Sequence, residues 1–463
     1  MSAPRVVVIG AGSASFGLNT LGAFLASERL GGWHLALVDR NPETLGWVKR
    51  LADRMNAEWE AGLSISAHTH HDDALEGARF VVSAIEVPPR EALWRQDYEI
   101  PLVFGVRQPY AENGGPGGFA HAARNIPPLM DIAHAMERYC PNAWLINYTN
   151  PMTRICDAVN RYSNIKVVGL CHQINMGYAL VGKALAGDYD IHVPDAFTNS
   201  AASPTVIPAR RAVVEQAQKR FEIIAAGTNH FTWIIDIRDK QSGNDLYPLF
   251  RQRWNELPEA FEPLTRRVFD AFGYFPVAGD EHLCEYLPWV SDPQTKPWEK
   301  FELDLYEWDL WDELRGDGHA DIQAMGAGEK STTALKDARS EGALEVIEHI
   351  CGAGHHFHQA FNLPNQGYIS NLPENSIVEV PGLVSGAGIH GLGVGALPRG
   401  IAELCRRELT VGQLGVDAAV QGDRQLALQC LLLDPVITDM DVARLILDKY
   451  LEDYRDFLPQ FWH

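Results

Sequence analysis

The chain has 463 residues, of which 46% are hydrophobic and 21% are charged, as in soluble globular proteins with two or three domains. Its formal net charge of −21 argues against nucleic acid and anionic membranes as partners. No apolar run approaches the ~18 residues of a membrane span, and the N-terminus runs into a strand without a signal peptide. The seven cysteines are scattered and odd in number, which favours a reducing cytoplasm over a disulfide framework.

The N-terminal residues predict a dinucleotide-binding turn between an apolar strand at 5–9 and a helix at 16–28. Gly10 allows the tight turn, and Gly12 lets the backbone approach a pyrophosphate at the amino end of the helix. Ser15 stands where a third glycine is usual.

A second strand at 33–38 ends at Asp39. This carboxylate can bind the 2′-hydroxyl of an adenosine ribose and would repel a 2′-phosphate, so the pattern favours NAD over NADP. We expect the cofactor to contact Gly10, Gly12, Ser13, Ser15, Phe16, Asp39 and Asn150.

Further apolar strands are predicted at 80–85, at 143–150 and at 167–170, and a helix capped by Asn41 is predicted to run to about residue 60. Alternating strands and helices predict a Rossmann-like, doubly wound parallel sheet, which we place in residues 1–200. Ligands bind at the carboxyl ends of such strands.

Polar residues follow two of these strands. Asn150 is either the cap of the next helix, with Pro151 as its first residue, or a carboxamide that binds substrate hydroxyls beside the nicotinamide. Cys171 and His172 follow the strand at 167–170, and a thiol and an imidazole there form a metal site, a nucleophile site or neither.

The stretch 108–118 contains four glycines and Glu112, which predicts a backbone that wraps closely around another group. Glu112 is either functional or an ordinary surface residue of this loop. Arg90 follows the strand at 80–85 and either faces a ligand or binds a backbone carbonyl.

From about residue 202 the pattern changes, and we assign 201–463 to an α+β domain for substrate binding and oligomerisation. Two strands at 221–226 and 231–237 suggest an antiparallel sheet, and a long helical stretch is predicted at 246–272. Residues 291–333 are rich in Trp and acidic residues; such aromatics more often pack a core or an interface than stack on sugars. A further strand at 378–381 and helices over 397–458 complete the chain.

Several motifs occur in a fixed order along the chain. They are Val-Ile-Gly-Ala-Gly-Ser (8–13), Gly-Pro-Gly-Gly (115–118), Asn-Tyr-Thr-Asn-Pro-Met (147–152), Cys-His (171–172), Gly-Thr-Asn-His-Phe (227–231), Gly-Tyr-Phe-Pro (273–276), His-Leu-Cys-Glu-Tyr (282–286), Asn-Gln-Gly (365–367) and Val-Glu-Val-Pro (378–381). The ordered set resembles glycoside hydrolase family 4, the NAD- and metal-dependent glycosidases. The resemblance covers residues 5–460, and the family's dinucleotide domain is similar to that of lactate and malate dehydrogenases.

The resemblance implies hydrolysis by temporary oxidation, which differs from the two-carboxylate route of other glycosidases. NAD accepts hydride from carbon 3 of the sugar, a base removes the proton on carbon 2, the glycosidic oxygen leaves, water adds and the steps reverse. Cys171 and His230 match the family's ligands for a divalent cation, which the family implies is manganese. Alternatively, Cys171 is an inert buried thiol and His230 is a core histidine.

The tyrosine that serves as the base in the family matches Tyr286. His282 and Asp280 are the other candidates for the base. Alternatively, Tyr286 is an aromatic residue packed under the loop. Glu112 falls where relatives carry the acid. We expect Asn150, His172 and Arg90 to contact substrate.

His172, where phosphosugar enzymes carry Asn, implies a non-phosphorylated sugar. The 279–282 run is similar to α-galacturonidases, and 285–289 to α-galactosidases. A homodimer or homotetramer is implied. The main alternative is an NAD-dependent 2-hydroxyacid dehydrogenase on the same fold, which would need no Cys171–His230 pair.

Overall fold

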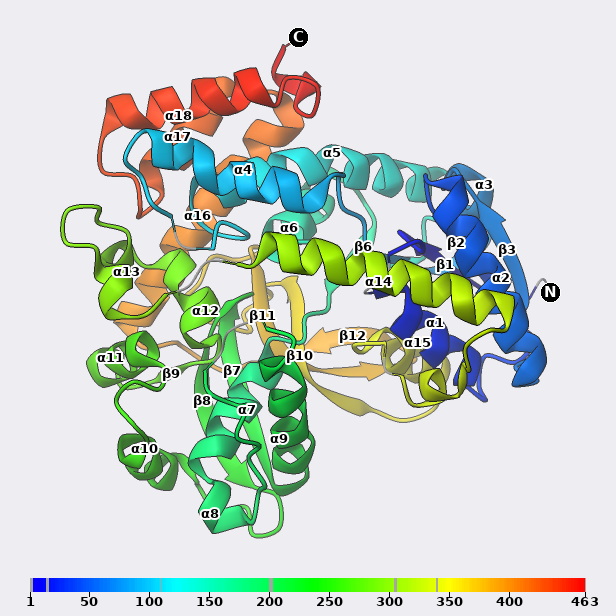
Figure 1. Ribbon diagram of the computed structural model, residues 1–463, viewed down its shortest axis with the longest axis horizontal. Coiled ribbons are helices and arrows are strands. Elements are labelled where there is room, and N and C mark those ends of the chain that lie inside the picture. Colours follow the sequence, from blue (N-terminus) through cyan, green and yellow to red (C-terminus); the bar gives the residue numbers. More distant parts are fainter. Residues whose placement is uncertain are drawn as a thin grey trace.

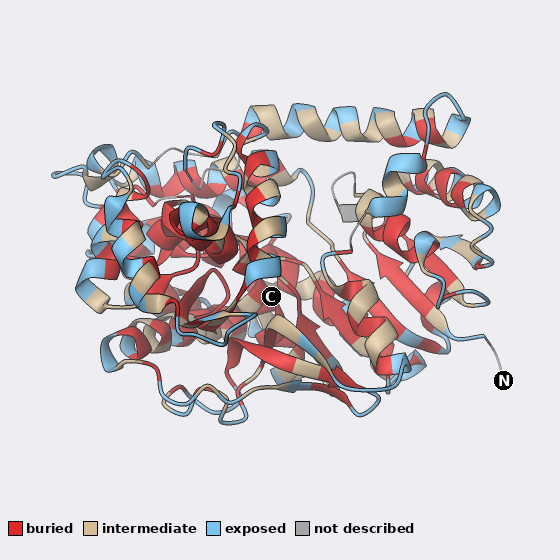
Figure 2. Cartoon of the chain, turned by 90° about the horizontal axis from the view of Figure 1, so that it is seen from below, coloured by how far each residue is buried: buried red, intermediate tan, exposed pale blue. Residues whose placement is uncertain are grey.

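The computed structural model describes residues 3–13, 16–108, 110–199, 203–303, 306–338 and 340–462; the side chains of residues 16 and 17 lie outside the description. One twelve-stranded sheet runs through the molecule with helices on both faces (Figure 1). Figure 2 shows buried strands between helices whose outer surfaces are exposed. None of the helices in the described part combines the length and apolar character needed to cross a membrane.

Six parallel strands in the order β3-β2-β1-β4-β5-β6 form the first half of the sheet. They are β1 (Arg5–Ile9), β2 (His34–Val38), β3 (Ser64–His68), β4 (Ala78–Ser83), β5 (Trp144–Asn147) and β6 (Lys166–Gly169). This order is that of a doubly wound dinucleotide-binding sheet, so the predicted fold class is confirmed.

Side chains of β1 alternate between two apolar clusters, one on each face of the parallel sheet. Val7 and Ile9 belong to the cluster under α5, α6 and the C-terminal helices, whereas Val6 and Val8 belong to the cluster under α1 and α2. A strand buried on both faces is continuously apolar, which is why β1 is easy to recognise in the sequence. The first six helices, which accompany this half, are α1 (Phe16–Ala26), α2 (Pro42–Glu58), α3 (Asp72–Leu75), α4 (Arg90–Val103), α5 (Gly115–Tyr139) and α6 (Met152–Tyr162). The next two, α7 (Ile174–Ala184) and α8 (Ala186–Tyr189), lie against the second half of the sheet.

The sheet continues past β6 with antiparallel strands in the order β10-β11-β7-β8-β9, and β12 pairs with β11. These strands are β7 (Phe221–Thr228), β8 (Phe231–Asp239), β9 (Phe275–Pro276), β10 (His356–Pro364), β11 (Ile377–Ser385) and β12 (Gly388–Gly391). The hairpin of β7 and β8 confirms the antiparallel pair predicted from the sequence. Strand β10 pairs with β6, and β11 pairs with β7, so the antiparallel half begins beside the end of β6.

The remaining helices pack on both halves (Figure 1). They are α9 (Val206–Arg220), α10 (Tyr247–Glu256), α11 (Pro263–Phe272), α12 (Gly279–Leu283), α13 (Pro297–Lys300), α14 (Trp308–Ala327), α15 (Ala343–Cys351), α16 (Arg399–Gln421), α17 (Arg424–Leu433) and α18 (Met440–Asp453). Helices α14 and α15 lie near α1 and α2, helices α16 to α18 lie near α5 and α6, and the others accompany the second half. Short 3-10 turns lie at η1 (Cys284–Tyr286), η2 (Pro288–Val290), η3 (Thr333–Asp337) and η4 (Pro459–Trp462).

Four local expectations need correction. Strand β3 was not predicted, because its sequence Ser-Ile-Ser-Ala-His has none of the apolar continuity of the other parallel strands and its side chains are half-buried or exposed. The stretch 246–272 forms two helices, since the residues 257–262 between them include Pro258 and the second helix starts at Pro263.

The other two corrections concern helix starts. Pro151, rather than Asn150, is the cap of α6, and the helix begins at Met152. Helix α5 begins at Gly115, so the glycines after it belong to the first turn of a helix instead of a loop.

Candidate active site

Cys171 and His230 meet at the junction between the parallel and antiparallel halves of the sheet. The Cys171 Sγ and His230 Nε2 atoms are 3.4 Å apart. Cys171 follows β6, and His230 is the second residue of the two-residue turn between β7 and β8. The structure therefore brings together the two residues expected to bind metal.

His230 is held in an uncommon backbone conformation, with φ at +61°. The neighbouring Asn229 donates to the buried carboxylate of Glu379 at 2.7 Å, and Asn362 donates to the same oxygen at 2.9 Å. These bonds tie the turn to β10 and β11. Burial, together with His282 and His172, lowers the pKa of His230 well below its usual range, so its imidazole is neutral, as a metal ligand must be.

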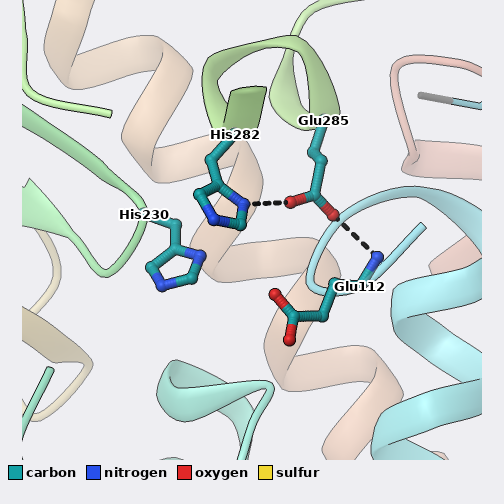
Figure 3. Close-up of side chains that lie close together, drawn as sticks. All are labelled: Glu112, His230, His282 and Glu285. Carbon is teal, nitrogen blue, oxygen red and sulfur yellow. Dashed lines mark hydrogen bonds and ion pairs between the residues drawn. The ribbon is translucent and has the colours of Figure 1, made fainter. Parts of the chain in front are cut away.

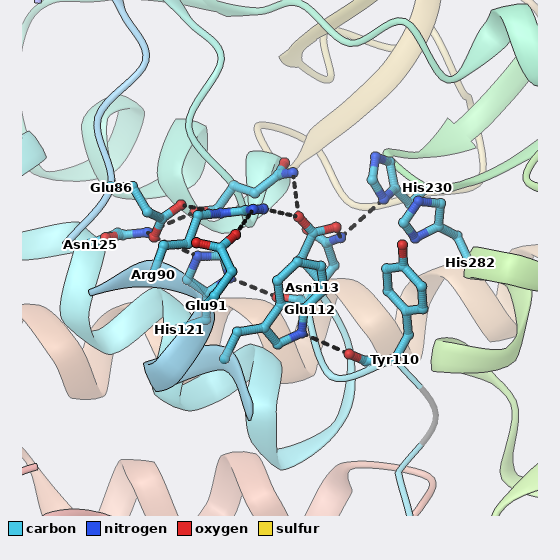
Figure 4. Close-up of polar contacts among 12 residues, drawn as sticks. Glu86, Arg90, Glu91, Tyr110, Glu112, Asn113, His121, Asn125, His230 and His282 are labelled. Carbon is cyan, nitrogen blue, oxygen red and sulfur yellow. Dashed lines mark hydrogen bonds and ion pairs between the residues drawn. The ribbon is translucent and has the colours of Figure 1, made fainter. Parts of the chain in front are cut away.

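Glu112 lies just before α5 and is held through both oxygens. Its Oε1 accepts from Arg90 at 3.1 Å and from Asn150 at 3.2 Å, and its Oε2 accepts from Asn113 at 2.9 Å (Figure 4). The Asn113 amide also contacts His230 Nδ1 at 3.0 Å. Five residues from four separate parts of the sequence thus form one polar chain that ends at His230.

Glu285 holds the loop that carries Glu112. This carboxylate is 1% exposed, and its Oε2 accepts from the backbone N–H groups of Glu112, Asn113 and Gly114 at 2.9, 2.7 and 3.1 Å. A Cβ on Gly114 would lie 2.6 Å from the carbonyl oxygen of Glu285. The glycine-rich stretch therefore wraps closely, as predicted, and the group that it wraps around is Glu285.

His282 completes the cluster. Its Nδ1 lies 3.0 Å from Glu285 Oε1, its ring centroid lies 4.2 Å from that of His230, and its other ring nitrogen turns toward the His230 side (Figure 3). Burial opposes protonation, but the hydrogen bond with Glu285 and the nearby carboxylates raise the pKa of His282 to about 9. Ligand atoms of Glu112, His230, His282 and Glu285 all lie within 4.8 Å of one another.

The other two base candidates lie differently. Both Asp280 oxygens accept backbone N–H groups of α11, from Leu264 at 2.9 Å and from Thr265 at 2.6 Å. Asp280 therefore caps α11, and burial raises its pKa to about 6. The Tyr286 ring stacks on Phe231 at 5.0 Å within an apolar cluster, and burial raises its pKa well above the usual value. Asp280 is not among the four residues whose ligand atoms form the cluster around His282.

His172 points its imidazole toward Glu341, which precedes α15. The His172 Nδ1 and Glu341 Oε2 atoms are 3.1 Å apart, and the His172 side chain is 67% exposed. The Glu341 carboxylate raises the pKa of His172. The pair therefore places a negative charge directly beside the residue predicted to contact the sugar.

The glycine turn after β1 has the shape of a dinucleotide cradle. Gly10 has φ at +86°, and a Cβ there would lie 2.4 Å from the carbonyl oxygen of Ala84. The Gly12 N–H donates to Asp39 Oδ2 at 2.8 Å, and Ser13 closes the turn onto the Gly10 carbonyl at 3.2 Å. Ser15 lies outside the described residues, and Phe16 is described only as the first backbone residue of α1. The residues present thus fit a dinucleotide.

The site residues also fit a divalent cation. A separation of 3.4 Å between Cys171 Sγ and His230 Nε2 suits two ligands of one ion at about 2.3 Å (sulfur) and about 2.1 Å (nitrogen). Asn113 Oδ1 has no hydrogen-bond partner among the described residues. The Asn113 nitrogen contacts both Glu112 Oε2 and His230 Nδ1. If the amide turned over, Oδ1 would accept Nδ1–H and leave Nε2 to bind the ion, at the loss of the bond to Glu112.

Comparison with known proteins identifies the family. The Family 4 glycosyl hydrolase model matches residues 5–186, and the model of the family's C-terminal domain matches residues 225–437. The chain belongs to family 4 of the glycosyl hydrolases. It is therefore a glycosidase of a family that depends on NAD and a divalent cation, and the dehydrogenase alternative is set aside.

Relatives of several specificities are similar along almost the whole chain. An α-glucosidase of Erwinia rhapontici is 30% identical over 94% of both chains, and an α-galactosidase of Bacillus subtilis is 29% identical over 99% of both. A probable 6-phospho-β-glucosidase of Bacillus subtilis is 31% identical over 99% of this chain and 98% of its own. Among solved structures, a putative glucosidase of Bacillus subtilis is 25% identical, with a TM-score of 0.82 over 97% of this chain and 100% of its own.

Two residues of the site were missed by reasoning from the sequence. Glu285 lay inside a quoted motif, and its spacing of three from His282 on a helical stretch was the signal that could have found it. Asn113 had no such signal, because its contact with His230 spans 117 residues of chain.

Proposed function

We propose that this protein hydrolyses non-phosphorylated α-glycosides with NAD and manganese bound at the site described above. The observation that carries the proposal is the contact between Cys171 and His230, two residues that an ordinary hydroxyacid dehydrogenase does not need. A 6-phospho-α-glucosidase solved in complex with NAD and Mn²⁺ has the same fold, with a TM-score of 0.79 at 20% identity.

Cys171 and His230 are the proposed cation ligands in preference to the carboxylates nearby. Both oxygens of Glu285 already accept hydrogen bonds, three from backbone N–H groups and one involving His282. Glu112 is likewise held by Arg90, Asn113 and Asn150. The remaining positions around the ion would be filled by substrate oxygens and water, which suits manganese.

NAD held at the Gly10–Gly12 turn would supply a hydride acceptor and donor for sugar carbon 3, and a cation held by Cys171 and His230 would supply the positive charge that polarises the sugar. We assign His282 to the removal of the proton on carbon 2. This role requires the neutral imidazole, and the positive charge of a bound cation would lower the raised pKa of His282. Its Nδ1 is held by Glu285 while its other nitrogen turns toward His230, the arrangement in which a carboxylate orients a histidine base. This choice rests on position, because Asp280 caps α11 and Tyr286 packs on Phe231.

We assign Glu112 to proton transfer at the glycosidic oxygen, with Arg90 as its positioning partner. Asn150 donates to Glu112 through Nδ2, and its Oδ1 has no partner among the described residues. A sugar hydroxyl can supply the missing donor, so we place Asn150 in substrate binding.

The pair of His172 and Glu341 supports a substrate without phosphate. A phosphate group needs unopposed donors or cations, and Glu341 lies 3.1 Å from His172. The similarity to an α-glucosidase and to α-galactosidases points the same way, whereas the similarity to a probable 6-phospho-β-glucosidase is the alternative to test.

The deciding experiment uses p-nitrophenyl glycosides of both anomers, with glucose, galactose, galacturonate and glucose 6-phosphate as the sugar. Each is assayed with NAD and Mn²⁺, with and without chelator. We expect cleavage of a non-phosphorylated α-glycoside that chelator abolishes, with solvent deuterium at carbon 2 of the released sugar. Exclusive cleavage of the phosphorylated substrate would overturn the substrate assignment, and cleavage without deuterium incorporation would overturn the mechanism.

We also propose that the enzyme is a cytoplasmic homodimer or homotetramer. All seven cysteines are free thiols, as in a reducing compartment. Apolar side chains are exposed on neighbouring helices, Val103 (76%) on α4, and Met440 (64%) and Leu445 (50%) on α18, and such a patch favours self-association. Light scattering of the purified protein tests the assembly; a monomer at micromolar concentration would contradict it.

A further inference from the structure

Helix α14 crosses from the second half of the molecule to the dinucleotide-binding half, in front of the parallel sheet (Figure 1). Its only fully buried residues are Trp308 at one end and Ile322 and Met325 at the other. Trp308 packs against Trp94 and Tyr98 of α4, whereas Ile322 and Met325 join the apolar cluster under α1 and α2. The helix is therefore anchored at both ends, and its middle is only partly covered.

The acidic and basic side chains of α14 differ mainly in their exposure. The side chains of four acidic residues are exposed to solvent: Asp309, Asp312, Glu313 and Asp317. The two basic residues, Arg315 and His319, are half-buried and one helical turn apart. They lie on the stripe that also carries the buried anchors. Asp312 falls on the same stripe but is exposed, and Asp321 is half-buried and pairs with Lys330, so Arg315 and His319 are the basic side chains that α14 directs inward.

The inner basic residues lie at the carboxyl ends of two adjacent strands. His319 Nε2 lies 3.0 Å from the carbonyl oxygen of Gly12, which follows β1, and the His319 ring packs edge-on to Trp47 of α2. Arg315 forms an ion pair with Glu91, in the first turn of α4 after β4. In a doubly wound sheet the pyrophosphate of a dinucleotide lies between these two strand ends.

We propose that α14 covers the bound dinucleotide and that, when it binds, His319 and Arg315 exchange their present partners, the Gly12 carbonyl and Glu91, for its pyrophosphate. The inference rests on the proposed binding of NAD at the Gly10–Gly12 turn. The helix supplies donors from above, and the amino end of α1 lies below. Because the same helix is anchored on Trp94 and Tyr98 of α4, next to Arg90, it also connects the cofactor to the loop of Glu112.

The test compares ligands that do and do not contain a pyrophosphate. Dissociation constants of NAD, ADP and adenosine are measured by titration calorimetry on the full-length protein, unaltered and as His319→Ala, His319→Gln and Glu313→Ala. Glu313 is the matched control because it lies on the exposed side of the same helix. Loss of one hydrogen bond to a charged group weakens binding about tenfold or more.

We expect His319→Ala to weaken the binding of NAD and ADP about tenfold and to leave the binding of adenosine unchanged. His319→Gln, which retains a hydrogen-bond donor, should recover part of the lost affinity. Glu313→Ala should bind all three ligands with the affinity of the unaltered protein. Hydrogen exchange of α14 should slow with NAD and with ADP but not with adenosine. Arg315→Ala should also weaken the binding of NAD and ADP, and Arg315→Lys should weaken it less.

If His319→Ala weakens the binding of adenosine as much as the binding of ADP, the residue only supports the Gly12 turn, and the inference is wrong. Unchanged ADP affinity would overturn it as well. If the unaltered protein binds NAD tightly and only the α14 effects are missing, the proposed function survives. If the unaltered protein binds neither NAD nor ADP, the proposed function itself fails.

Discussion

The thiol of Cys171 and the imidazole of His230 lie 3.4 Å apart although 59 positions separate them in the chain. Their contact exists because β10 and β11 join β6 to β7 in one continuous sheet. The end of a parallel strand and the turn of an antiparallel hairpin thereby meet in one place, and the proposed chemistry depends on this meeting.

Replacing Cys171 by serine should remove metal-dependent turnover. We expect the affinity for Mn²⁺ to fall by more than the ~10–100-fold that loss of an outer partner causes, because a direct ligand is lost. Manganese binding is measured by calorimetry in the presence of NAD. Cys351→Ser is the control, since Cys351 is exposed. Normal Mn²⁺ affinity in Cys171→Ser would remove Cys171 from the site.

Replacing Glu285 by alanine should damage both activity and stability. Three buried backbone N–H groups would lose their acceptor, so we expect the free energy of unfolding to fall by about 3 kcal/mol or more. We also expect kcat to fall because His282 loses its orienting partner. Urea unfolding and steady-state kinetics measure the two effects. Glu403→Ala, at an exposed position, is the control, and an unchanged kcat in Glu285→Ala would contradict the orienting role.

The three candidates for the base predict different effects of substitution. His282→Ala should lower kcat by about 10²–10⁴-fold. Asp280→Ala should mainly lower the free energy of unfolding, by about 2 kcal/mol, because it removes the cap of α11. Tyr286→Phe should keep kcat within a few-fold. If Tyr286→Phe abolishes deuterium exchange at carbon 2 while His282→Ala retains it, the base is Tyr286.

Asp434 predicts a dependence of stability on pH. Burial, with repulsion from Glu408, raises the pKa of Asp434 to about 7, so the folded protein holds a proton that the unfolded chain releases near pH 4. The free energy of unfolding should therefore decrease as pH rises from about 4 to 7, by about 2–4 kcal/mol for this group.

The measurement is urea unfolding of the parent protein and of Asp434→Asn between pH 4.5 and 7.5. Asparagine remains neutral, so the difference between the two curves should grow with pH in favour of the variant. Asp448→Asn, at an exposed position, should run parallel to the parent. A constant difference across this range would show that Asp434 ionises in the folded state as it does in the unfolded chain.

The sequence by itself determined the parallel half of the fold and most of the site residues. Strands such as β1 are apolar throughout because both faces are buried, and the Gly10 turn and Asp39 are local patterns. Strand β3 escaped because its half-exposed side chains need not be apolar. Cys171 and His230 stood in motifs whose order along the chain resembled the family, and Glu112 lies three residues before one of them, Gly-Pro-Gly-Gly (115–118).

Only the tertiary structure decided which role each candidate residue has. Asp280, His282 and Glu285 lie within six residues of each other in sequence, yet Asp280 caps α11 whereas His282 and Glu285 face His230 and Glu112. The direction of a side chain in a short helical turn depends on the elements that pack around it, and here those elements come from distant parts of the chain. For the same reason no sequence pattern showed that His319 of α14 lies against the carbonyl of Gly12.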